Sequence, residues 1–296
     1  YRQIDSRFRE ELGLSPSREL QDLHGRMLRG DASLQAPSTA LRNNTAPANT
    51  LLRDNPDFTG REEQLRVLLR AAEPGSTALP LFVLHGMPGV GKTTLAVHAA
   101  HLLRDEYPDG HLYLDLRAHS RHGQPWRDPF DALADLLRFI DYTAELPATL
   151  DERAAVWRKQ VANLRLLLVL DDAHDAEQVR PLLPGTPKCC VIVTSRHSLA
   201  GLEGARSLAL DVLSTAEASA MFTRIIGSSR AADKSAVLDV VRMCDRHPLA
   251  IHVVANRLRH REAWEVRDLA DRLALSSEPL EEIDGPPGIV TAFSCS

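Results

Sequence analysis

The sequence predicts an α/β fold, in which a five-stranded parallel sheet with helices on both faces is followed by a small all-α domain. Short, nearly continuous apolar runs alternate with helical patterns between residues 79 and 212, which is typical of a parallel sheet buried on both sides. After Ser214 the apolar runs stop and only helical periodicity remains. A chain of 296 residues, 44% hydrophobic and 25% charged, has room for two or three globular domains.

The elements follow in chain order. A helix is expected after the sequence FTGRE at 58–62, with Thr59 or Gly60 as its cap. Thr149 with Glu152, and Ser214 with Glu217, have the spacing of capping boxes at two later helices. The predicted strands are 79–85, 111–117, 165–171, 189–195 and 207–212. The predicted helices are near 92–104, 128–140, 150–163, 176–183, 215–226, 233–245, 248–260 and 265–274.

These elements suggest a division into domains, with an α/β domain at 57–213 and a helical domain at 214–284. Residues 1–30 contain two short amphipathic helical patterns around a glycine, and Tyr1 already stands inside the first, so we expect the protein to extend further upstream. Residues 31–56, rich in Ala, Asn, Thr, Ser and Pro, read as a linker.

Charge and cysteine content restrict the class of protein. The net charge of −5 argues against a nucleic-acid-binding body by itself, because phosphate neutralisation needs a basic face. Cys189 and Cys190 are adjacent and show no metal-ligand spacing, which indicates reduced thiols in a cytoplasmic protein. No apolar run approaches the roughly 18 residues that span a bilayer and no signal peptide is visible, so no membrane partner is expected.

The segment HGMPGVGKTT at 85–94 follows the first predicted strand and opens a helix. Its glycines allow backbone N–H groups to converge on an anion, Lys92 supplies a charge for the β and γ phosphates, and Thr93 offers a hydroxyl to Mg²⁺. The pattern GxxxxGK[ST] is complete, so we interpret the sheet as that of a P-loop NTPase rather than the segment as a surface turn. The predicted contact residues are Gly86, Met87, Pro88, Gly89, Val90, Gly91, Lys92, Thr93 and Thr94.

Two carboxylates close the third predicted strand. Asp171 ends the run LLLVL and fits the role of holding Mg²⁺, while Asp172 is a candidate for polarising the attacking water. Asp172 has the alternative role of capping the following helix. The separation of Lys92 from Asp171 leaves room for one further strand between them, as in the additional-strand branch of P-loop proteins.

Arg196 follows the fourth predicted strand, where a guanidinium could contact the γ-phosphate and so distinguish ATP from ADP. The alternative is an ordinary surface arginine. Together Lys92, Asp172 and Arg196 form the candidate catalytic set.

With these motifs in order, residues 57–284 resemble an NB-ARC ATPase of the STAND class of signal-transducing switches. GMPGVGKTT, VLDD and VTSR correspond to the family's phosphate loop, Walker B and sensor elements. The resemblance implies that Gly60 and Arg61 of FTGRE lie at the nucleobase or close the site. Pro248 and Leu249 of RHPLA match the family's GLPLA motif, which implies that both belong to the nucleotide site and that Pro248 packs on the adenine, although His247 departs from that motif.

The first 30 residues are similar to the end of a bacterial transcriptional activation domain of the SARP type of actinomycete antibiotic regulators. This resemblance implies DNA as a partner, through a winged-helix domain upstream, with RNA polymerase as a further partner and self-association controlled by nucleotide. Residues 285–296 would begin a second winged-helix domain, whose ADP-reading histidine is absent from this sequence.

Three functions follow from these patterns. The leading hypothesis is an ATP/ADP switch with Mg²⁺ that regulates a transcription activator and is reset by slow ATP hydrolysis. The second is a P-loop motor or phosphotransferase, for which we see neither an arginine finger nor an acceptor pocket. The third is an interaction module that keeps a nucleotide as a structural filler.

Overall fold

The computed structural model describes residues 48–70, 78–119 and 125–275. The predicted activation-domain end at 1–30, the segment 285–296 and most of the predicted linker lie outside the described residues. Among the described residues, none of the helices is long and apolar enough to cross a membrane.

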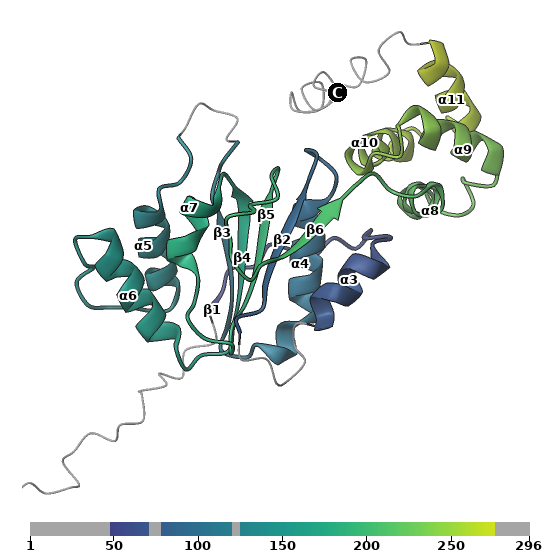
Figure 1. Cartoon of the computed structure of the whole chain (residues 1–296). Coiled ribbons are helices and arrows are strands. Elements are labelled where there is room, and N and C mark those ends of the chain that lie inside the picture. Colours follow the sequence, from purple (N-terminus) through teal and green to yellow (C-terminus); the bar gives the residue numbers. More distant parts are fainter. Residues whose placement is uncertain (1–47, 71–77, 120–124, 276–296) are drawn as a thin grey trace, which may run out of the picture. The chain divides into compact units, whose positions relative to one another are not determined.

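The central element is a six-stranded sheet, all parallel, in the order β1-β3-β4-β5-β2-β6 (Figure 1). Its strands are β1 (Ala48–Asn49), β2 (Leu81–Gly86), β3 (Gly110–Asp115), β4 (Leu166–Ala173), β5 (Cys190–Ser195) and β6 (Arg206–Leu210). One strand, β5, lies between β2, which leads into the glycine-rich loop, and β4, which carries Asp171, so the predicted class of fold is confirmed. All five predicted strands are present.

The prediction of five strands was nevertheless wrong by one, because β1 lies in the segment interpreted as a linker. Ala48 and Asn49 carry no alternating apolar pattern, and their strand exists only through pairing with Gly110 and His111 of β3. Just beyond β1, Thr50 Oγ1 accepts a hydrogen bond of 2.8 Å from the backbone N–H of Tyr113. Tertiary pairing, rather than local propensity, therefore makes this edge strand.

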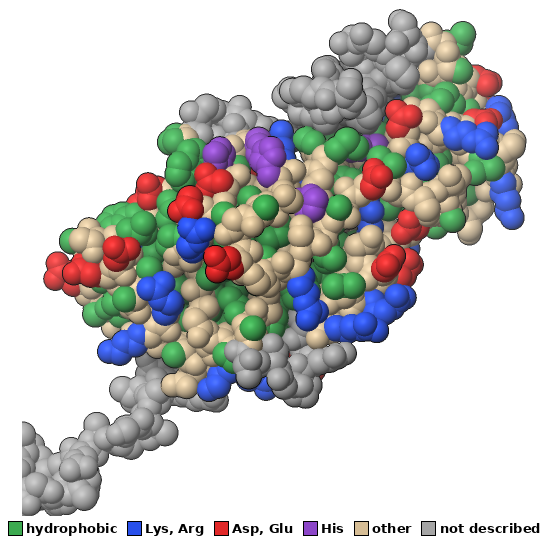
Figure 2. Space-filling model, viewed as in Figure 1, with side chains coloured by type: hydrophobic (Ala, Val, Ile, Leu, Met, Phe, Trp, Pro, Cys, Tyr) green, Lys and Arg blue, Asp and Glu red, His purple; other side chains and the backbone are tan. Residues whose placement is uncertain are grey.

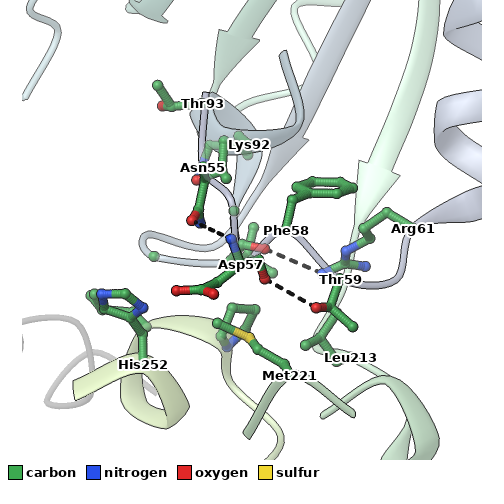
Figure 3. Close-up of a pocket in the computed structure, with 16 residues that line it drawn as sticks. Asn55, Asp57, Phe58, Thr59, Arg61, Lys92, Thr93, Leu213, Met221 and His252 are labelled. Atoms are coloured by element: carbon green, nitrogen blue, oxygen red, sulfur yellow. Dashed lines mark hydrogen bonds between the residues drawn. The ribbon is translucent and has the colours of Figure 1, made fainter. Parts of the chain in front are cut away.

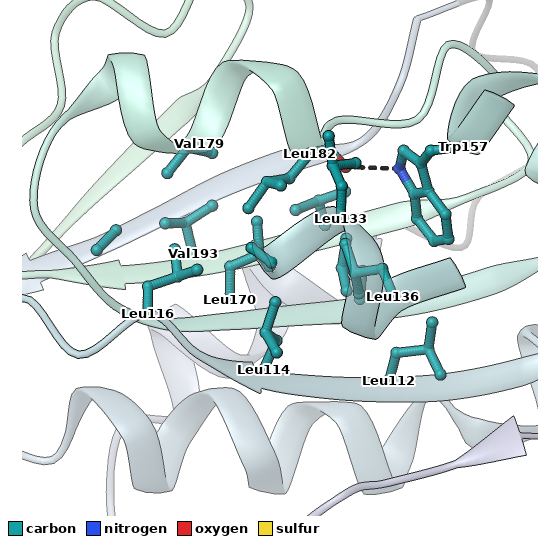
Figure 4. Close-up of a cluster of buried hydrophobic side chains, with 14 of the residues drawn as sticks. Leu112, Leu114, Leu116, Leu133, Leu136, Trp157, Leu170, Val179, Leu182 and Val193 are labelled. Carbon is teal, nitrogen blue, oxygen red and sulfur yellow. Dashed lines mark hydrogen bonds between the residues drawn. The ribbon is translucent and has the colours of Figure 1, made fainter. Parts of the chain in front are cut away.

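Alternate side chains of the strands supply two cores. Leu81, Val83 and their equivalents pack against α5 (Pro129–Phe139), α6 (Leu150–Val161) and the turn formed by α7 (Ala176–Val179) and η4 (Arg180–Leu182). Trp157 is fully buried there, and its indole N–H donates to the carbonyl of Leu182 at 2.8 Å (Figure 4). This core fixes one face of β4, the strand that carries the acidic pair.

The opposite face of the sheet, with Phe82 and Leu84, packs against α3 (Glu62–Leu69) and α4 (Lys92–Leu102), which is followed by η3 (Arg104–Glu106). Helices on both faces agree with the predicted class. The predicted cap of α3 was wrong: its N-cap is Arg61, with φ of 66° and no side-chain cap. The backbone N–H of Arg61 is instead satisfied by Glu217, which is 156 residues away in sequence.

After β6 the described chain is entirely helical, as predicted, with α8 (Thr215–Ile226), α9 (Lys234–Met243), α10 (Pro248–Arg259) and α11 (Val266–Leu275). These helices share a separate core that includes Phe222, Val240 and Ile251. The predicted box at the start of α8 is present, because Ser214 and Glu217 cap each other's backbone N–H groups.

Figure 2 shows acidic and basic side chains interspersed over the visible face.

Candidate nucleotide site

The glycine-rich loop runs from the end of β2 to the start of α4, at the carboxyl edge of the sheet. Gly89, near the middle of the loop, has φ of +72°, an angle that residues other than glycine rarely adopt. The first residue of α4 is Lys92, so the unpaired N–H groups of the helix N-terminus face the same loop. The loop is therefore built to accept an anion.

Lys92 folds back over this loop. Its Nζ donates to the carbonyls of Gly86 and Met87, at 2.8 Å each. Burial, reinforced by the charge of Arg196, lowers the pKa of Lys92 to about 8, against the opposing influence of Asp172 and Asp171. An anion beside Lys92 would relieve both unfavourable effects, so the ammonium is suited to binding phosphate.

Asp171 is buried at the end of β4 and faces the start of α4. Its Oδ1 accepts hydrogen bonds from Thr93 Oγ1 at 2.7 Å and from Thr194 Oγ1 at 2.5 Å. Its Oδ2 accepts from the Tyr113 hydroxyl at 2.8 Å. A carboxylate next to the threonine that follows Lys92 is the oxygen donor set that Mg²⁺ prefers, so Thr93 and Asp171 fit a magnesium ion.

Asp172 has different partners although it is the next residue. It adopts φ of 52°, and its carboxylate oxygens accept from the backbone N–H and the imidazole Nδ1 of His119, at 2.8 and 2.9 Å. The alternative of a helix cap was wrong, because Asp175 caps α7 through the N–H of Gln178. The two neighbouring carboxylates are thus directed to separate surroundings.

Arg196 follows β5 directly and is exposed. Its charge lies close enough to depress the pKa of Lys92. This places a guanidinium on the same edge of the sheet as the phosphate loop.

A cavity of about 310 Å³ adjoins the loop (Figure 3). Three parts of the chain line it: the segment before α3, the phosphate loop with the start of α4, and residues of α8 and α10 with Leu213. Of the predicted residues, it brings together Arg61, Gly89, Val90, Gly91, Lys92, Thr93, Thr94, Pro248 and Leu249. The predicted residues Gly60, Gly86, Met87, Pro88, Asp171, Asp172 and Arg196 lie outside this lining.

Sequence reasoning missed seven lining residues: Asn55, Asp57, Phe58, Thr59, Leu213, Met221 and His252. Phe58 stacks on His98 with ring centroids 4.0 Å apart, and His98 Nδ1 contacts the Asp54 carboxylate at 3.0 Å. Figure 3 shows the Asp57 carboxylate turned towards His252 of α10. Phe58 and Thr59 stood inside the FTGRE sequence and could have been included, whereas Leu213 and Met221 look like ordinary core residues in sequence.

The Arg61 side chain contacts the phosphate loop. Its Nη2 donates to the carbonyls of Val90 at 3.2 Å and Asp211 at 2.5 Å. Burial lowers the pKa of Arg61, opposed by the charges of Glu217 and Asp211. Gly60 lies against the Glu217 carboxylate, because a Cβ there would be 2.6 Å from Oε1.

His247, the residue that departs from the family motif, is buried at the N-cap of α10. Its Nε2 lies 2.9 Å from the carbonyl of Pro88, so that nitrogen carries the proton of the bond. Asp245 and Arg246 precede it with φ of 48° and 58°. This turn delivers the first residues of α10 to the phosphate loop.

Comparison with known proteins agrees with the fold. A family model described as an AAA ATPase domain matches residues 57–188. The Aeropyrum pernix ORC2 protein, solved as ADPNP and ADP complexes, superposes with a TM-score of 0.52 over 79% of this chain and 73% of that chain. At 14% identity, this likeness shows the fold alone. The sheet, the loop and these matches define a P-loop ATPase core.

The sequence relatives are more specific. The regulatory protein AfsR of Streptomyces griseus is 44% identical over 284 residues, which is 93% of this chain and 28% of AfsR. AfsR of Streptomyces coelicolor is 41% identical over 296 residues, 96% of this chain and 29% of that protein. AfsR regulatory proteins, of the SARP type, are thus close homologues of this P-loop ATPase core, and the chain spans less than a third of their length.

Proposed function

We propose that the chain is the nucleotide-operated switch of a SARP-type transcriptional regulator. The observation that carries this proposal is the shared pocket: the phosphate loop lines it together with Met221 of α8 and with Pro248, Leu249 and His252 of α10. A nucleotide held there contacts both the loop and the helical part. Its phosphate state can then alter how firmly the helices engage the loop.

Each predicted residue has a role in this proposal. Lys92 and the amides of the loop bind the β and γ phosphates, and Thr93 with Asp171 holds Mg²⁺. Arg196 reads the γ-phosphate, and Asp172 orients water for a slow hydrolysis that resets the switch. Phe58, Pro248 and Leu249 surround the adenine, while Gly60 and Arg61 hold the segment that closes this side.

The energy that such a switch requires is modest. A ligand that binds one conformation roughly 100-fold more tightly than the other shifts their equilibrium by about 2.7 kcal/mol. One charge-assisted contact from Arg196 to a γ-phosphate contributes about 1.5–3 kcal/mol, and ADP lacks that contact. ATP and ADP can therefore favour different arrangements.

The proposal extends to the longer protein. Residues 57–213 would form the nucleotide-binding domain and residues 214–284 the helical domain, between a preceding activation domain and a following winged-helix domain. The partners would be promoter DNA, through an upstream winged-helix domain, and RNA polymerase, with nucleotide-controlled self-association in the cytoplasm. In this arrangement the module controls a regulator of antibiotic biosynthesis.

The test begins with the nucleotide that copurifies with the protein, identified by chromatography after denaturation. We expect ADP that exchanges for ATP in the presence of Mg²⁺, with heats of binding for both in calorimetry of the stripped protein. Absence of heat for either nucleotide would refute the proposal. A nucleotide that never exchanges would favour a structural filler, and fast turnover stimulated by DNA would favour a motor.

A further inference from the structure

The three hydroxyl groups around Asp171 come from three different elements. Thr93 belongs to α4, Thr194 to β5 and Tyr113 to β3. Thr93 and Thr194 both belong to segments that the sequence patterns had singled out. Tyr113 had not been assigned any role, and of these three hydroxyl groups it is the one that contacts Oδ2.

The three hydrogen bonds leave a defined acceptor on Asp171. A carboxylate has about four lone-pair positions, two on each oxygen. The two threonines occupy both positions on Oδ1, and Tyr113 occupies one position on Oδ2. Within the described residues no other group hydrogen-bonds to Oδ2, so one of its lone pairs is left for a cation or for a water molecule bound to it.

The direction of the protons agrees with a cation at this place. Because a carboxylate accepts, the hydroxyl of Thr93 must donate to Asp171, and its own lone pairs then face away from the carboxylate. Thr194 Oγ1 accepts from the backbone N–H of Asp172 at 3.0 Å while donating to Asp171, so it is engaged on both sides. Oδ2 of Asp171 and Oγ1 of Thr93 are the oxygens with acceptor capacity to spare.

Tyr113 is itself firmly placed. Its backbone N–H donates to Thr50 Oγ1 at 2.8 Å, and Thr50 Oγ1 donates to its carbonyl at 3.3 Å. In the β3–β4 register Asp115 is opposite Asp171, so Tyr113 is the diagonal neighbour on the same face, within reach of a long side chain.

We infer that Tyr113 is a positioning residue for the metal carboxylate: its hydroxyl fixes Oδ2 of Asp171 so that the remaining lone pair faces the magnesium ion of a bound nucleotide. This inference rests on the proposed function, since it concerns the metal that accompanies the nucleotide. Removal of a group that orients a metal ligand typically weakens metal binding by about 10- to 100-fold.

The variant Tyr113→Phe removes one oxygen atom and keeps the ring. Its matched control is Tyr142→Phe, because Tyr142 packs against the core on the other face of the sheet. The ADP affinity of stripped wild type and of both variants is measured in excess EDTA, in the absence of free metal. In separate samples without EDTA, Mn²⁺ binding to each ADP complex is followed by electron paramagnetic resonance.

We expect Tyr113→Phe to weaken Mn²⁺ binding by about 10- to 100-fold while ADP affinity in EDTA stays within about twofold of wild type. Tyr142→Phe should leave both quantities unchanged. Unchanged or tighter Mn²⁺ binding in Tyr113→Phe overturns the inference, and so does an equal loss of ADP affinity in EDTA. If wild type binds no ADP under either condition, the proposed function itself fails, which is a different result.

Discussion

His247 donates a hydrogen bond of 2.9 Å from its imidazole Nε2 to the backbone carbonyl of Pro88. One residue belongs to the start of α10 and the other to the middle of the phosphate loop. This bond joins the first turn of α10 directly to the phosphate loop, although the two segments lie far apart in the sequence.

The contact predicts a pH effect on stability. Burial lowers the pKa of His247, assisted by the charge of Lys92 and opposed by Pro88 and Asp245. The unfolded chain then binds more protons than the folded one below about pH 6.5, the ordinary value for histidine, so stability falls as pH decreases through that value. Thermal unfolding should show a smaller loss between about pH 7.5 and about pH 6 in His247→Gln than in wild type.

A suitable control for that measurement is His260→Gln, since His260 is exposed beyond the last turn of α10. It should retain the wild-type dependence. The same dependence in His247→Gln would show that the buried imidazole does not titrate as described.

Gly89 limits how closely α10 can approach. A Cβ at this position would lie 2.8 Å from His247 Cε1 and 2.9 Å from Leu249 Cβ, on a backbone with φ of +72°. Gly89→Ala should destabilise the fold by about 1–3 kcal/mol, from left-handed strain together with displacement of α10. It should also weaken nucleotide binding, as measured by chemical unfolding and calorimetry.

Gly204→Ala separates these two causes. Gly204 has nearly the same backbone, with φ of +75°, but no atom within 4 Å of an added Cβ. This variant should show only the strain, about 1–2 kcal/mol, with unchanged nucleotide affinity. Equal effects of the two variants would mean that contact between α10 and the loop contributes nothing.

Lys92→Ala should abolish measurable nucleotide binding. The ammonium is the charge placed over the loop, and charge-assisted bonds of about 1.5–3 kcal/mol each correspond to at least about 10- to 150-fold in affinity. Calorimetry with ATP and with ADP checks this result. Lys159→Ala, on the exposed side of α6, is the control, and similar affinities for the two variants would contradict the role given to Lys92.

Asp172→Asn should keep nucleotide binding and lose turnover. An amide cannot accept the proton of an attacking water, and loss of a general base typically slows a reaction by about 10²–10⁴-fold. Single-turnover hydrolysis of radiolabelled ATP, beside ATP affinity, separates the two effects. Equal hydrolysis by wild type and Asp172→Asn would remove this aspartate from the mechanism.

Local patterns were sufficient for much of the fold. The apolar runs around Val83, Leu168 and Ile192 correctly predicted strands of a sheet covered on both faces. In the structure these three side chains are buried. The box of Ser214 and Glu217 predicted the start of α8 for the same local reason. The patterns around Lys92 and Asp171 also indicated residues that meet in space, since one follows β2 and the other stands near the carboxyl end of β4 in the same parallel sheet.

What the sequence could not reveal depends on contacts between distant residues. The strand at Ala48 forms only because β3 pairs with it, and the start of α3 at Arg61 depends on a carboxylate far along the chain. The contact between His119 and Asp172 likewise joins the turn after β3 to the end of β4. The periodicity of a sequence shows which residues are buried but not which distant residues they contact. For this reason Met221, which lines the pocket, could not be distinguished from a core residue in the sequence.

Glu217 has a consequence beyond its capping of α8. Oε2 accepts from the N–H of Ser214 at 2.9 Å, while Oε1 accepts from the N–H of Arg61 at 2.8 Å. If α8 turned away from residue 61, that amide would lose its acceptor unless solvent entered the crevice to replace it. Separation of α8 from the segment that precedes α3 therefore requires a water molecule to reach the backbone N–H of Arg61.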